Sequence, residues 1–230
     1  AMSVGYAQDM YVETSLSSAS FDDFKNDEGV NTLDNKYSSP LELGIGAGVI
    51  LKITKNNRLK WDMGVNFNKY KINTSFRALN TSIPAEYNLN YVGFKTGPYF
   101  SVINHSRIKL QLHAHSSFDY LIFGSNEYKD VYVDLLEGKS FSKLVMSYHY
   151  GAAVEVTLSD SSSFYMSYDF KNGLTNSIDN DQSYRLNATS ILMGFRFTVN
   201  KLKKTGISQW SRWSRPDSFP ARREGSNEHT

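Results

Sequence analysis

The stretch that decides the fold runs from Leu41 to Ile72 and reads LELGIGAGVILKITKNNRLKWDMGVNFNKYKI. On both sides of its polar centre, KNNR at 55–58, every second residue from Leu41 to Phe67 is apolar, and the residues between, up to Asn68, are polar, charged or glycine except for Ile50. A period of two predicts strands with one apolar face. Each strand has about twice the usual length of roughly 5–6 residues and reaches the ~9–11 residues of a transmembrane β-strand. We therefore interpret the stretch as a membrane-spanning β-hairpin.

Directly opposed residues of a hairpin share a face, so the loop at 55–58 must have an odd number of residues, about three or five. The same alternation recurs and predicts strands at 10–16, 41–54, 59–72, 85–102, 108–122, 144–158, 164–171 and 184–199. Longer loops at one end alternate with short turns at the other, as in outer-membrane barrels, which places both termini in the periplasm. The longer loops are expected at 19–40, 78–84, 124–140 and 173–182. Residues 184–188 run out of phase, which predicts a β-bulge near Thr189.

Composition excludes several classes of protein. The chain has 230 residues, enough for one domain, and only 40% of them are hydrophobic. The mean hydropathy is −0.44, and no run approaches the ~18–20 apolar residues of a transmembrane helix. Cysteine is absent, which excludes disulfides and thiolate metal sites, and a net charge of +2 gives no reason to expect a nucleic-acid partner.

The alternative to a membrane barrel is a soluble lipocalin-like barrel, which has the same pattern turned inside out. Eight bulky aromatic faces turned inward would overfill so small a barrel. The polar faces carry glycines among their charges, which suits a narrow lumen filled by long side chains. Aromatic residues also occur towards the strand ends, where interfacial girdles are expected, at Trp61, Phe100, Tyr120, Tyr148, Phe164, Phe170 and Phe197. The sequence therefore predicts an all-β, eight-stranded antiparallel up-and-down transmembrane barrel.

The span from Asp9 to Asn200 resembles the small eight-stranded outer-membrane barrels, which include the OmpX-like and PorT-like families. GFRFTV at 194–199 is similar to the C-terminal assembly signal of these barrels, although Leu192 stands where that signal has a polar residue. The resemblance implies a non-enzymatic structural or accessory subunit of an outer-membrane assembly, secretion machinery included, with outer-membrane lipid around it. The alternatives are a small pore, a loop-mediated surface adhesin and a lipid-modifying barrel enzyme.

The chain divides into three parts. Residues 1–8 resemble the end of a signal peptide or form a disordered N-terminus, residues 9–200 form the barrel, and residues 201–230 form a basic periplasmic tail. Paired tryptophans and arginines in this tail are expected to anchor a protein partner, a role that extracellular loops could share: Trp210, Arg212, Trp213 and Arg215. Deleting the tail should leave the barrel inserted and remove that partner.

The polar strand faces predict an ionic lattice that fills the lumen, because unpaired charges there would be costly. Its members are Glu42, Lys52, Lys60, Asp62, Lys95, Lys109, Asp119, Glu155, Asp169, Lys171 and Arg196. No catalytic residue or cofactor is expected.

Three histidines on polar faces, His113, His115 and His149, are the candidate metal ligands. If residue 123 lies opposite residue 141, His115 and His149 are cross-strand neighbours. A three-residue turn at 104–106 would set Lys95 opposite His115, and Lys171 should lie near His149. Since those positive charges repel a metal ion, no metal site is predicted. The spacing of His115 and Ser117 is similar to part of the lipid A deacylase motif, but both residues fall on the lumen face rather than towards lipid.

Overall fold

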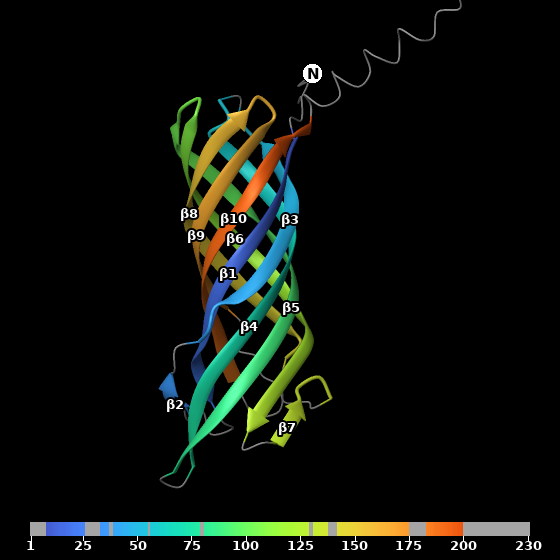
Figure 1. The fold of residues 1–230 in the computed structure, drawn as a ribbon, viewed down its shortest axis with the longest axis vertical. Coiled ribbons are helices and arrows are strands. Elements are labelled where there is room, and N and C mark those ends of the chain that lie inside the picture. Colours follow the sequence, from blue (N-terminus) through green and yellow to red (C-terminus); the bar gives the residue numbers. More distant parts are fainter. Residues whose placement is uncertain are drawn as a thin grey trace, which may run out of the picture.

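The computed structural model describes residues 8–25, 33–36, 39–54, 56–78, 81–128, 131–137, 142–174 and 183–199. Ten strands form one sheet (Figure 1). They are β1 (Gln8–Lys25), β2 (Leu33–Lys36), β3 (Glu42–Lys52), β4 (Leu59–Ala78), β5 (Thr81–Asn104), β6 (Ile108–Tyr128), β7 (Val131–Asp134), β8 (Leu144–Ser159), β9 (Ser162–Gly173) and β10 (Ser183–Thr198).

Eight of these strands close into a ring in which every neighbouring pair is antiparallel. The order is β1-β3-β4-β5-β6-β8-β9-β10, and β10 returns to β1 through pairs such as Asp9 with Thr198. This confirms the predicted eight-stranded up-and-down barrel. The two short strands were not predicted: β2 pairs with β4, and β7 pairs with β6.

Three tight connections lie at the end of the barrel where β1 begins and β10 finishes, the upper end in Figure 1. In the β3–β4 connection, Lys52 opposes Lys60 and the Ile53 amide donates to the Leu59 carbonyl over 3.1 Å, leaving five residues in the loop. The predicted odd number is therefore confirmed. Asn57 adopts a left-handed conformation with φ of 56°, which asparagine tolerates better than most residues.

The other end departs from the prediction, because four strands run further than their alternation suggested. β4, β5 and β6 have 20, 24 and 21 residues, and only residues 79 and 80 separate β4 from β5. The predicted loop at 78–84 is therefore wrong. The loops predicted at 19–40 and 124–140 are shorter than expected, since β1 continues to Lys25 and β6 continues to Tyr128.

The bulge predicted near Thr189 is also wrong. Leu186, Ala188, Leu192 and Gly194 are all buried towards the interior, so β10 keeps one phase along this length. The register shift instead falls on β1, between Phe21 and Phe24. The alternation looked out of phase because the interior of the barrel becomes apolar at this end.

The outer surface carries an apolar band. Its side chains alternate with the interior ones on every strand of the ring, as Val12, Ile45, Val65, Phe94, Phe118, Val154, Met166 and Phe195 illustrate. In the part of the chain that the structure describes, no helix has the length and apolar character needed to cross a membrane. A ring of strands with a lipid-compatible exterior and a polar interior has the chemistry of a membrane-spanning barrel.

Candidate functional site: the barrel interior

The charged residues of the strands meet inside the ring. At the turn end, Glu155 accepts from Lys109 Nζ over 2.6 Å through one carboxylate oxygen and pairs with Arg196 through the other. The Arg196 guanidinium also donates to Gln111 Oε1 over 2.6 Å. It lies over the ring of Tyr165, with 4.3 Å between Cζ and the ring centroid. One buried carboxylate thus holds cations from two other strands, β6 and β10.

Further along the interior, Lys95 Nζ lies 2.5 Å from Glu13 Oε1, and the Tyr165 hydroxyl donates to the other oxygen of Glu13 over 2.6 Å. Towards the loop end, Lys171 donates to Asp119 over 2.8 Å and to the Tyr70 hydroxyl over 3.3 Å. The pairs join strands on different sides of the ring. They therefore act as cross-links through the interior as well as neutralising buried charge.

Lys52 pairs at the mouth with Asp9, with 3.1 Å between Nζ and Oδ1. Glu42 lies apart from the other predicted lattice residues, because it pairs over 3.2 Å with Lys69, whose side chain is 46% exposed. The prediction omitted Asp9 and Glu13, although both share the interior phase of β1 and alternate with the apolar Met10, Val12 and Leu16. The same alternation on β1 would have predicted that Asp9 and Glu13 face the interior.

The three histidines have separate partners. Nε2 of His113 lies 3.0 Å from Asp169 Oδ1, and Nε2 of His115 lies 3.3 Å from Asp62 Oδ2. Nε2 of His149 lies 2.9 Å from the Ser117 hydroxyl. Across the described ranges, no group of three or more histidine or acidic side chains could hold a metal ion.

The register around the histidines is partly as predicted. His115 opposes His149, and His149 in turn opposes Lys171, which confirms both expected pairings. The expectation that Lys95 opposes His115 is wrong, since Lys95 opposes Ser117. The predicted three-residue turn at 104–106 is wrong, because Asn104 opposes Lys109, and a register shift between Ser101 and Ile103 then moves β5 by one residue relative to β6. Ser117 and His115 are both buried in the interior, and Ser117 bonds His149 instead.

Glycines on β3 and β4 leave room for the long side chains of β1. A Cβ on Gly48 would lie 2.6 Å from the ring of Tyr11, and a Cβ on Gly64 would lie 2.1 Å from its hydroxyl. A Cβ on Gly46 would likewise lie 2.8 Å from Oε1 of Glu13. The space on β3 is therefore used by side chains of the directly neighbouring strand, whereas the space at Gly64 on β4 is used by Tyr11 reaching past β3.

We expect Gly64→Ala to destabilise the folded barrel by about 1–3 kcal/mol, because the Tyr11 ring must move within a packed interior. Urea unfolding in lipid vesicles measures the effect. In a Tyr11→Phe background the same substitution should cost less, since the clashing hydroxyl is gone. An equal cost in both backgrounds would show that Tyr11 is not the obstacle.

The interior changes from ionic to apolar at the loop end. Tyr70 and Tyr91 have ring centroids 6.1 Å apart, and Phe21 meets Tyr87 edge-to-face at 5.2 Å. We call this buried set the outer core. Its members are Ala19, Phe21, Tyr70, Ile72, Ala85, Tyr87, Leu89, Tyr91, Leu121, Leu135, Val145, Leu186 and Ala188. The predicted lumen was polar throughout, so the outer core is a correction to it.

No protein-family model matches the chain, and no curated protein matches it. Several solved structures are similar in fold. The match to Neisserial surface protein A covers 83% of this chain and 96% of that protein's chain, with a TM-score of 0.47 and 10% sequence identity. The match to the outer membrane protein OprG of Pseudomonas aeruginosa covers 84% of this chain and 96% of the OprG chain, with a TM-score of 0.48 and 8% sequence identity. The match to Ail, the attachment invasion locus protein of Yersinia pestis, covers 83% of this chain and 99% of the Ail chain, with a TM-score of 0.42 and 11% sequence identity.

The apolar exterior and the closed ring establish the setting of the chain. It is a small β-barrel of the outer membrane. Single-chain barrels with an even number of strands, short turns at one end and longer loops at the other reside in the outer membrane of Gram-negative bacteria. Here the longer connections are β1–β3, β6–β8 and β9–β10, and the β4–β5 connection at the same end is short but closes a long hairpin. By the same rule we expect the short-turn end, with Lys52 and Asp9, to face the periplasm and the outer core to lie at the extracellular end. The predicted tail residues Trp210, Arg212, Trp213 and Arg215 lie outside the described residues.

Proposed function

We propose that the chain is a closed, non-enzymatic barrel that presents a β-sheet extension for binding at the cell surface. The observation that carries the proposal is the change of pattern along β5. Its outward residues are apolar at Val92 and Phe94 but polar at Asn90, Asn88 and Glu86, while its inward residues change from Lys95 to the apolar Tyr91, Leu89 and Tyr87. Beyond this point, from about residue 69 of β4 and up to residue 90 of β5, the sheet is built like a soluble protein, with its apolar side inside. We call this part of the sheet the extension.

The β4–β5 part of this extension has an outer surface suited to water, whereas β7 exposes Val131, Tyr132 and Val133. Lys71 Nζ lies 2.7 Å from Glu86 Oε1, and the Asn88 side chain donates to the same oxygen over 3.2 Å. The hydrogen bond from Lys71 holds the pKa of the Glu86 carboxyl below its ordinary value. The edges of the extension are paired with β2 and β7, which limits uncontrolled edge-to-edge association. An ordered, water-compatible sheet of this kind supports a role in recognition.

The filled interior argues against the pore alternative. The outer core closes the loop end, and below it lies a cavity of about 30 Å³ among Lys95, His149 and Lys171. An eight-stranded barrel leaves just enough interior for side chains. Ser117 is buried and hydrogen-bonds the half-buried His149, so its hydroxyl is not presented to lipid or solvent, which supports a non-enzymatic role.

The proposal is tested by shortening the β4–β5 hairpin. Replacing residues 75–84 by Asn-Gly keeps the register, because Thr74 opposes Ala85, and a two-residue turn suits this pairing. Cells displaying the full chain should bind one or more immobilised matrix proteins or polysaccharides, and the shortened chain should lose at least ~10-fold in that binding. Both chains must show heat-modifiable migration on gels. Equal binding by the two, or none by either, contradicts the proposal.

The second candidate function is an accessory subunit of an outer-membrane assembly, secretion included, which the PorT-like resemblance of the sequence favours. In this role the tail would bind the partner protein, through a segment in which Trp210 and Trp213 alternate with arginines. Deleting the chain after Leu202 is expected to leave the barrel inserted and to remove a periplasmic partner in mild-detergent purification. Trp210→Ala/Trp213→Ala should have most of the same effect, since buried tryptophan anchors often cost ~2 kcal/mol or more when truncated. Unchanged co-purification would exclude this role.

A further inference from the structure

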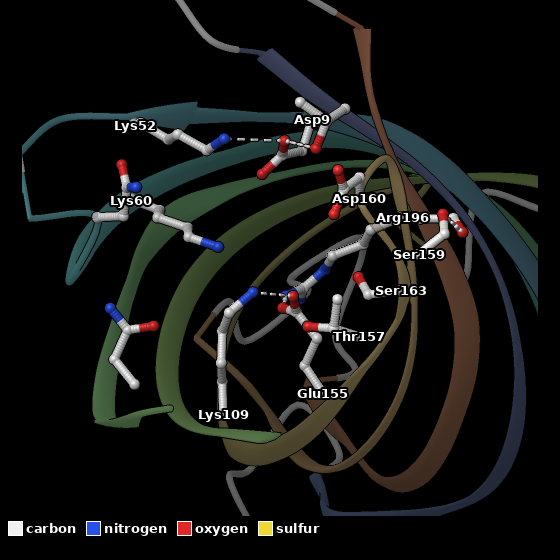
Figure 2. Close-up of a pocket in the computed structure, with 14 residues that line it drawn as sticks. Asp9, Lys52, Lys60, Lys109, Glu155, Thr157, Ser159, Asp160, Ser163 and Arg196 are labelled. Atoms are coloured by element: carbon white, nitrogen blue, oxygen red, sulfur yellow. Dashed lines mark hydrogen bonds and ion pairs between the residues drawn. The ribbon is translucent and has the colours of Figure 1, made fainter. Parts of the chain in front are cut away.

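The periplasmic mouth of the barrel contains a cavity of about 140 Å³, which we call the vestibule. Figure 2 shows charged side chains from several strands converging on it. Four cations and three carboxylates line it, together with hydroxyl and amide groups that include Thr157, Ser163 and Asn57. The charged residues are Asp9, Lys52, Lys60, Lys109, Glu155, Asp160 and Arg196.

Most of these charges have partners on the wall of the vestibule. Glu155 is engaged by both Lys109 and Arg196. Asp9 is engaged by Lys52 and accepts a hydrogen bond from the Thr198 hydroxyl over 2.8 Å. The carboxylates of Glu155 and Asp9 therefore have little capacity left for another cation.

Lys60 differs from the other cations of the vestibule. Its side chain extends from β4 towards the vestibule (Figure 2), and the residue is only 3% exposed. Among the described residues it forms no ion pair and donates no side-chain hydrogen bond, whereas Lys52, Lys109 and Arg196 each have a carboxylate partner. A buried ammonium that forms no ion pair is costly even with carboxylates such as Glu155 and Asp9 elsewhere on the same wall. An anion in the vestibule would remove that cost.

We propose that the vestibule binds a small oxyanion of the phosphate class, with Lys60 as its principal cation. The cavity has room for several waters and hence for a tetrahedral anion of their combined size. An ammonium binds such a group as a point charge with three donors, and the hydroxyls of Thr157 and Ser163 supply neutral donors to the remaining oxygens. This site lies at the opposite end from the surface extension and does not depend on the function proposed for it.

The test is calorimetric titration of inorganic phosphate into the folded full-length chain, in non-ionic detergent at pH 7 and constant ionic strength set with chloride. The wild type should give saturable binding, and Lys60→Met should weaken it at least ~10-fold. Lys60→Arg, which keeps the charge, should stay within a few-fold of the wild type. Lys69→Met is the matched control, because Lys69 lies on the same strand but outside the vestibule, and it should bind like the wild type.

Each variant must first show the heat-modifiable migration of a folded barrel, and Lys60→Gln replaces Lys60→Met if the latter does not fold. The proposal is wrong if phosphate produces no saturable heat with the wild type. It is also wrong if the variant without the Lys60 charge binds as tightly as Lys69→Met. If phosphate binds only after residues 200–230 are deleted, the chain's own tail fills the vestibule and the proposal of a free oxyanion ligand fails.

Discussion

Glu155→Ala is expected to destabilise the barrel by about 3–5 kcal/mol, the cost of breaking a buried ion pair by removing one partner. Glu155 is 3% exposed and joins cations from β6 and β10. Its loss leaves Lys109 without an ion-pair partner among the described residues, and Arg196 with Gln111 as its polar neighbour. Few other single changes remove two charge pairs at once.

Urea unfolding in lipid vesicles, followed by tryptophan fluorescence, gives the free energy of unfolding. The matched control is Glu86→Ala, which removes the exposed pair with Lys71 in the extension and should cost less than about 1 kcal/mol. Combining Glu155→Ala with Arg196→Met should cost less than the sum of the two single changes, because the second change removes a charge that the first leaves unpaired. Additive costs, or similar effects of Glu155→Ala and Glu86→Ala, would contradict the cross-linking role.

Leu89→Ala should destabilise the extension by about 2–5 kcal/mol, the usual range for a buried leucine truncated to alanine. Leu89 is fully buried at the centre of the outer core. Because Leu89 lies beyond the apolar band of β5, with Asn88 and Asn90 facing outward beside it, the loss should loosen the extension and leave the membrane-inserted part of the barrel folded.

Trypsin digestion of intact cells measures this effect, since Lys69 and Lys71 lie in the extension. Cleavage there should become much faster in Leu89→Ala, while gel migration of the uncleaved barrel stays heat-modifiable. Val92→Ala is the control, because it lies on the same strand and faces lipid. If Val92→Ala increases cleavage as much as Leu89→Ala, the outer core is not what holds the extension together.

The period-two pattern sufficed to predict the ring, because each membrane-spanning strand sets an apolar exterior against a polar interior. It also placed His115 opposite His149, since face parity restricts the possible registers to alternate residues. Ile50 broke the alternation for a physical reason: it is buried against Tyr11 and Tyr165 in a small apolar contact within the ionic interior.

The extension could not be predicted from that pattern. Where β5 leaves the membrane, Tyr91 faces inward and the adjacent Val92 faces outward, so both faces are apolar and the alternation disappears. The pairing of Lys95 was missed because the β5–β6 turn differs from the predicted three residues, with Asn104 opposite Lys109, and because the register shifts just beyond it. Val102 and Ile103 are consecutive exposed residues at a register shift, and a strict alternation assigns them to opposite faces.

The point on which the proposed fold in the membrane depends is that β5 passes from lipid into extracellular water between Phe94 and Asn88. Because the chain contains no cysteine, single cysteines can be placed at Glu86, Asn88, Phe94 and Phe118 and treated with a membrane-impermeant maleimide on intact cells. We expect rapid labelling at 86 and 88 and protection at 94 and 118. Equal labelling at all four positions would indicate a soluble barrel, and labelling at 86 and 88 only after the outer membrane is permeabilised would reverse the orientation.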